Sequence, residues 1–166
     1  CKLSLCRYRL TRNNVRLRTA SISDIPILIL IAQGFIKEAP NYQSRELDIK
    51  ALEENLRTII DGVGAVFVAE KGEQIVGGIV CLTTKDWFNN QVIAFEQVFY
   101  VLPEYRATRA PLMLIDAFIS WARHMGASRV QSGTTTGIST KGCVRLYEYF
   151  GFIQHGILLD LELVHE

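Results

Sequence analysis

The chain has 166 residues, of which 49% are hydrophobic and 21% charged, with a formal net charge of +1. This length suits one domain with a sizeable core, and the composition excludes a disordered chain. Because the charge is nearly balanced, we expect neither a nucleic acid nor a membrane as the principal partner.

The four cysteines show no metal-ligand or redox spacing, and Cys81 and Cys143 lie in apolar stretches typical of small buried side chains. The longest apolar run, residues 25–32, is much shorter than the roughly 20 residues that span a bilayer. The amino end has no apolar segment of the secretory type. We therefore expect a cytoplasmic protein that holds no metal.

Residues 1–14 are basic, with four cations and no acid. A nucleic-acid-binding arm is one interpretation, and a disordered or artificial terminus is the favoured one. The folded domain is therefore expected to cover residues 15–166.

The first half of this domain predicts a strand, two helices and a hairpin. Residues 25–37 are apolar nearly all round, so periodicity alone allows either a strand or a helix, and their length favours a helix. The sequence Lys71-Gly72-Glu73 is a typical hairpin turn. The expected elements are strand 15–20, helices 25–37 and 46–60, and strands 63–70 and 74–83.

The second half alternates strands and helices. Residues 95–101 are aromatic and β-branched, as in a strand, and an apolar helical face runs from Pro111 to a stop near Gly126. His124 is expected to face the dipole at the end of that helix and to have no catalytic role. Further elements are expected at strand 128–132, helix 143–150 and one bent or two separate strands over 154–164. The element order predicts an α/β domain with a mixed sheet.

A short basic turn, residues 106–110, joins the strand at 95–101 to the following helix. It carries Arg106 and Arg109 and no acid. Free backbone N–H groups and the positive end of the helix dipole would meet there, an arrangement that suits a phosphate. Such units are common and most bind nothing, so this signal is weak on its own.

Residues 100–106 read YVLPEYR and resemble the entry to the acyl-CoA loop of the GNAT superfamily of N-acetyltransferases. The usual loop is Arg/Gln-x-x-Gly-x-Gly/Ala; here Arg106 holds the first position, Arg109 the glycine position and Pro111 the last small position. Residues 146–152, LYEYFGF, are similar to the family's second segment, L-Y-x-x-x-G-F. The resemblance implies a mixed, mostly antiparallel sheet of six to seven strands flanked by four helices.

The same resemblance implies acetyl-CoA as the acyl donor. Pro111 supplies no N–H, whereas Arg109 adds a guanidinium suited to phosphate oxygens. The residues expected to bind the donor are Phe99, Val101, Arg106, Ala107, Thr108, Arg109, Ala110, Leu112 and Thr140.

Glu96 and Tyr147 are the expected catalytic residues. Glu96 lies on the central strand among apolar residues, where a carboxyl pKa rises and suits a general base. An outward-facing or ion-paired glutamate is the competing interpretation. Tyr147 matches the tyrosine that the family places near the thioester sulfur, and ordinary core packing is its alternative.

The acceptor is expected to be a primary amine, and a small amine, an antibiotic, a peptide amino terminus and a protein lysine all stay open. Tyr42, Trp87 and Phe88 could line its pocket, although loop aromatics more often pack locally. Two rival functions remain: a non-catalytic acyl-CoA-binding module, and an interaction protein that uses its basic amino end. A homodimer is left open.

Overall fold

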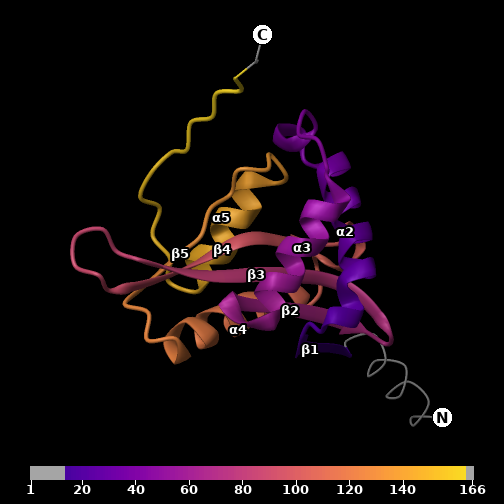
Figure 1. The fold of residues 1–166 in the computed structure, drawn as a ribbon, viewed down its shortest axis with the longest axis horizontal. Coiled ribbons are helices and arrows are strands. Elements are labelled where there is room, and N and C mark those ends of the chain that lie inside the picture. The colour runs from indigo at the N-terminus through magenta and orange to yellow at the C-terminus, as the bar shows by residue number, and fades with distance from the viewer. Residues whose placement is uncertain (1–13, 164–166) are drawn as a thin grey trace, which may run out of the picture.

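The computed structural model describes residues 14–163 and shows a five-stranded sheet with helices on both faces (Figure 1). Strand order follows the chain, and only the last pair of strands is parallel. This architecture confirms the α/β fold class with a mixed sheet and four helices. The strands are β1 (Val15–Thr19), β2 (Gly64–Lys71), β3 (Gln74–Lys85), β4 (Val92–Val101) and β5 (Arg129–Gln131), and the helices are α2 (Ile25–Glu38), α3 (Ile49–Thr58), α4 (Ala110–His124) and α5 (Thr140–Tyr149).

The core has two main layers, one on each face of the sheet. Helix α4 packs its apolar stripe, with Leu114 and Phe118 fully buried, on one face. Helices α2 and α3 cover the other face with Ile25, Leu28 and Leu56. A smaller cluster of Phe35, Ala39 and Tyr100 joins the end of α2 to β4.

Buried charges fasten the first strand to the start of α2. The guanidinium of Arg18 donates to Asp24 at 2.7 and 2.9 Å and to Glu70 at 2.7 Å. Both carboxylates are buried, and hydrogen bonds from Arg18 hold their pKa values below the ordinary range. Buried carboxylates need such partners, and removing one partner of a buried pair is strongly destabilising.

Strand β4 contains a bulge. Its pairing with β3 passes from Val80 opposite Val98 to Cys81 opposite Glu96, so Gln97 has no opposite residue. The parallel pairing of β4 with β5 ends one residue earlier, at Phe95 opposite Gln131. From Glu96 onward, β4 therefore has a free edge on the β5 side within the described part of the chain.

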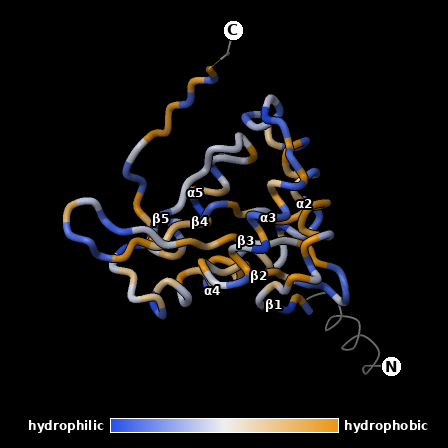
Figure 2. Tube along the Cα trace, in the orientation of Figure 1, coloured by the Kyte–Doolittle hydropathy of each residue, from blue (hydrophilic) through white to orange (hydrophobic). Residues whose placement is uncertain are grey.

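The expected strands over residues 154–164 are wrong as far as residue 163, and the sheet has five strands rather than six or seven. Residues 153–163 contain no regular structure, and the chain leaves the body of the protein there (Figure 1). Apolar and acidic residues alternate from Leu159 to Leu163 within this segment (Figure 2). A strand requires a neighbour for its backbone hydrogen bonds, and no described segment pairs with this one.

Two helix boundaries also differ from expectation. Helix α3 begins at Ile49 rather than at 46, because the Asp48 carboxylate caps it by accepting the Ala51 N–H at 3.0 Å. Helix α5 begins three residues earlier than expected, at Thr140.

The predicted arm, residues 1–14, lies outside the described residues except for Asn14. No helix within residues 14–163 is long and apolar enough to cross a membrane.

Candidate active site

Glu96 and Tyr147 meet beside the point where β4 and β5 diverge. The Tyr147 hydroxyl donates to Glu96 Oε1 at 3.5 Å, and the Gly133 N–H donates to the same oxygen at 3.2 Å. Glu96 lies on β4, Gly133 follows β5, and Tyr147 lies on α5. Three separate elements therefore bring one carboxylate, one phenol and one amide together.

Burial raises the pKa of Glu96 to about 7, although the hydrogen bonds from Gly133 and Tyr147 act in the opposite direction. No cation pairs with this carboxylate in residues 14–163. The described residues thus give no support to the ion-paired alternative for Glu96. A carboxyl with a pKa near neutrality can accept and return a proton at ordinary pH.

Tyr147 is held by aromatic contacts. Its ring packs edge-on against Phe152 at a centroid distance of 5.2 Å and against Phe99 at 6.2 Å. Only 6% of the residue is exposed, and burial together with the nearby Glu96 raises the pKa of the phenol. Tyr147 thus remains protonated and has one fixed position, as a proton donor requires.

The turn before α4 presents several free amides. Thr108 stabilises this turn, since its hydroxyl donates to Tyr105 O at 2.6 Å and accepts the Ala110 N–H at 3.2 Å. The N–H groups of Ala107, Arg109 and Leu112 have no acceptor among residues 14–163. Arg109 has φ −75°, so its backbone does not need a glycine there. Its side chain is exposed and makes no ion pair with any described residue.

Arg106 has a different arrangement from Arg109. Its guanidinium donates to Glu38 at 2.6 and 2.7 Å, and its Nε donates to Val101 O at 2.9 Å. The Tyr100 hydroxyl donates to the same carboxylate at 2.6 Å. Arg106 therefore anchors the turn to the end of α2, and its charge is already neutralised by Glu38.

The other expected residues are more scattered. Phe99 and Val101 lie on the free edge of β4, whereas Thr140 begins α5 and lines an open hollow with Lys141 and Arg145. Trp87 and Phe88 are each 92% exposed in the β3–β4 turn, so neither lines a pocket in this structure.

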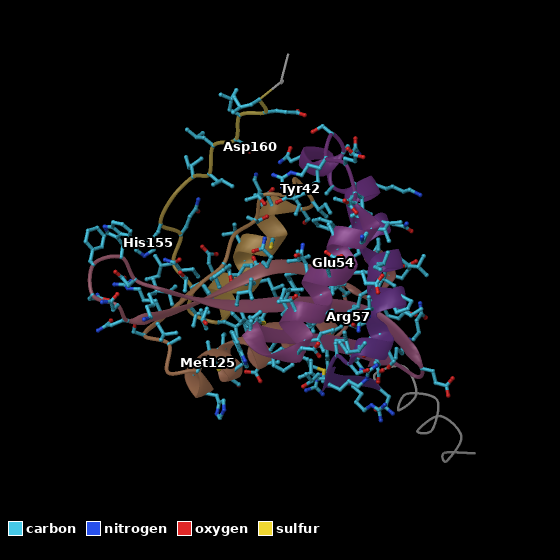
Figure 3. The ribbon with its side chains drawn as sticks, viewed as in Figure 1. Tyr42, Glu54, Arg57, Met125, His155 and Asp160 are labelled. Carbon is cyan, nitrogen blue, oxygen red and sulfur yellow. The ribbon has the colours of Figure 1, made fainter. Side chains whose placement is uncertain are left out.

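Tyr42, labelled in Figure 3, lies on the connection after α2. Its hydroxyl hydrogen bonds to Thr135 Oγ1 at 2.8 Å, and the Asn41 N–H donates to Thr136 O at 3.2 Å. The connection that follows Glu38 is therefore also tied to the loop after β5.

The sequence interpretation missed Glu38, Gly133 and Ser132. Glu38 left one signal, because a carboxylate at the last position of a helix opposes the helix dipole and so calls for a cationic partner. Gly133 contacts Glu96 through its backbone N–H, so its residue type gave no signal in the sequence. Ser132 follows β5 directly, and its hydroxyl is buried without a hydrogen-bond partner in the described residues.

The fold agrees with several solved structures, among them acetyltransferases. An acetyltransferase of Trypanosoma brucei superposes with a TM-score of 0.70 at 20% identity, covering 90% of this chain and all of that one. AAC(6')-Iy, bound to the bisubstrate analogue CoA-S-monomethyl-acetylneamine, gives 0.74 at 15% identity, covering 92% of this chain and all of that one. A transcriptional regulator from Bacillus halodurans C-125 gives 0.74 at 19% identity, with coverage of 90% and 100%.

Comparison with curated protein sequences finds no match. The sequence model of the Acetyltransferase (GNAT) family, in contrast, matches residues 31–152. This span contains most of the sheet, the basic turn, Glu96 and Tyr147. The chain therefore belongs to the acetyltransferase (GNAT) family.

Proposed function

We propose that the protein transfers an acetyl group from acetyl-CoA to a primary amine by direct attack of the amine on the thioester. The observation that carries this proposal is the contact between Glu96 and Tyr147 at the free edge of β4. One group suits a base near neutral pH, and the other stays protonated. Acyl transfer to an amine needs both kinds of group.

In this mechanism Glu96 takes a proton from the incoming ammonium group, and the free amine attacks the thioester carbonyl. When the carbon–sulfur bond breaks, Tyr147 gives its proton to the departing thiolate. The protonated Glu96 then returns a proton to the Tyr147 phenolate, and the new amide nitrogen releases its extra proton to water. The products are the acetylated amine, CoA thiol and one proton.

Binding of the donor would use backbone groups. The free edge of β4 at Phe99–Val101 offers a backbone N–H to the thioester carbonyl. Its other unpaired backbone groups can form hydrogen bonds with the amides of the pantetheine part of CoA. The diphosphate would meet the amides of Ala107, Arg109 and Leu112 at the start of α4, with the Arg109 side chain alongside.

The first prediction tests binding and turnover together. Acetyl-CoA at a hundredfold excess over its dissociation constant should stabilise the fold by about 2.7 kcal/mol, and a panel of amines should trigger release of CoA thiol. Thermal shift and a thiol assay measure the two effects, with aminoglycosides, polyamines, peptides and lysine as acceptors. Binding without thiol release from any amine would favour the non-catalytic alternative, and absence of binding would remove both.

Arg109→Ala should weaken CoA binding roughly tenfold without changing the melting temperature of the free protein. The side chain is exposed and unpaired among the described residues, so only a ligand phosphate would lose a charge-assisted bond. Calorimetric titration with CoA measures the affinity. Arg123→Ala, at the other end of the same helix, is the control. Equal affinity for Arg109→Ala and wild type would mean that the turn binds through its amides alone.

Glu38→Gln should raise the KM for acetyl-CoA about tenfold while changing kcat much less. The substitution breaks the bidentate contact that fixes Arg106 and the start of the basic turn, whereas Glu96 and Tyr147 are untouched. Steady-state kinetics separate the two constants. Glu53→Gln, which breaks only the exposed pair with Arg57 (labelled on α3 in Figure 3), is the matched control. A proportional loss of kcat would contradict a role confined to the turn.

Glu96→Gln should lower kcat/KM about 10²-fold just above neutral pH. In wild type, kcat/KM should rise with pH through about 7 as the carboxyl loses its proton, and the variant should lack this rise. The defect should shrink at high pH, where the amine itself is deprotonated. A pH–rate profile of both proteins tests this.

Stability supplies the control for that variant. Burial raises the pKa of Glu96 from its ordinary value of 4.5 to about 7. Between these two pH values the folded state therefore holds a proton that the unfolded state has lost. The contribution of Glu96 to stability is then complete below pH 4.5 and is lost as the pH rises through 7. The glutamine variant should therefore be at least as stable as wild type above neutrality. A pH-independent rate defect or a large loss of stability would assign Glu96 to packing.

A further inference from the structure

The Ser132 hydroxyl is the one buried side-chain oxygen or nitrogen in residues 14–163 without a hydrogen-bond partner. Burying a hydroxyl without a partner costs stability, so native structures rarely keep one without a reason. An alanine would remove the cost with little change in volume. The position of Ser132 in the candidate site suggests what the hydroxyl does there.

Ser132 lies between the elements that build this site. It follows the last residue of β5, and the next residue is Gly133, whose N–H holds Glu96 Oε1 at 3.2 Å. Tyr147 donates to the same oxygen from α5. The Ser132 hydroxyl approaches the phenol of Tyr147 without forming a well-aligned hydrogen bond, and this approach lowers the pKa of the phenol against the larger, raising effects of burial and Glu96.

We propose that Ser132 is a positioning residue that donates its hydrogen bond to the Tyr147 oxygen when Tyr147 gives its proton to the thiolate. This role rests on the proposed acetyl transfer. In the free protein the Tyr147 hydroxyl points its proton at Glu96 Oε1. When that proton is transferred to sulfur, negative charge develops on the phenol oxygen, which then accepts a hydrogen bond from Ser132.

The other groups around the phenol are unsuited to donate a hydrogen bond to the Tyr147 oxygen. Glu96 faces Tyr147 and repels a phenolate while it is ionised, and the Cys143 thiol on α5 also raises the pKa of the phenol. The Gly133 N–H is already used by Glu96. Ser132 is thus the hydroxyl at this point, among residues 14–163, whose donor is still free, and a preformed donor needs no rearrangement when charge appears.

The test compares Ser132→Ala with Ser128→Ala, whose hydroxyl already donates to Val92 O at 3.3 Å. A donor to a developing oxyanion contributes about 10²–10³-fold to kcat, and one acting through a second residue should contribute about tenfold. We expect Ser132→Ala to lose about tenfold in kcat with an unchanged KM for acetyl-CoA and an unchanged or higher melting temperature. Ser128→Ala should keep the wild-type kcat.

The double variant Ser132→Ala/Tyr147→Phe separates this role from a direct contact with substrate. Because Ser132 acts through the phenol oxygen, removing its hydroxyl should cost nothing further once Tyr147 is phenylalanine. Ser132→Cys, with a similar size and a weaker donor, should give an intermediate rate. An undiminished effect of Ser132→Ala in the phenylalanine background, or a wild-type rate for Ser132→Ala, would overturn the proposal.

A readout independent of turnover uses protein labelled with ¹³C-tyrosine. Adding CoA should shift the signal of the Tyr147 ring carbon that bears the hydroxyl, and Ser132→Ala should reduce this shift. Assignment follows from loss of the signal in Tyr147→Phe. If wild-type protein binds no CoA, the proposed function fails; if it binds CoA and Ser132→Ala responds identically, only the role of Ser132 fails.

Discussion

The divergence of β4 from β5 is the constraint on which the candidate site depends. Pairing with β5 stops at Phe95, and the bulge at Gln97 follows two residues later. Opposite residues of antiparallel strands share a face, so Glu96 and Phe99 lie on the same face, opposite Cys81 and Ile79. Without the extra residue, the period of two would place Phe99 on the other face from Glu96. Tyr147 can contact both side chains because the bulge brings them together.

A second constraint joins the basic turn, residues 106–110, to the rest of the domain. Glu38, at the end of α2, receives Arg106 from the turn and Tyr100 from β4. The connection that follows Glu38 is hydrogen bonded to the loop after β5. The segment after α2 therefore contacts both sides of the gap between β4 and β5. The two arginines of the turn have different roles. Arg106 holds the backbone in place, and the exposed charge of Arg109 stays available to a ligand.

The site keeps groups that a purely structural core would replace. Glu96 is a carboxyl without a cationic partner in the described residues, and Ser132 is a hydroxyl without a hydrogen bond there. The ionised Glu96 carboxylate and the unpartnered Ser132 hydroxyl each lower the stability of the folded state, and both lie within the same small region as Tyr147. Stability sacrificed at one place is typical of functional sites, whereas the Arg18 cluster near β1 shows buried charges fully paired.

The sequence by itself determined the α/β class and most element positions, which follow from local periodicity, and two short motifs resembling those of a known family singled out Glu96 and Tyr147 as candidates. The tertiary structure alone decided that Arg106 is paired with Glu38, 68 residues away in sequence. It also decided that the Gly133 N–H contacts Glu96, that the Ser132 hydroxyl is buried beside this contact, and that residues 153–163 form no strand. A bulge, a long-range ion pair and the neighbour that a strand requires depend on contacts between distant segments, and local residue patterns carry no record of such contacts.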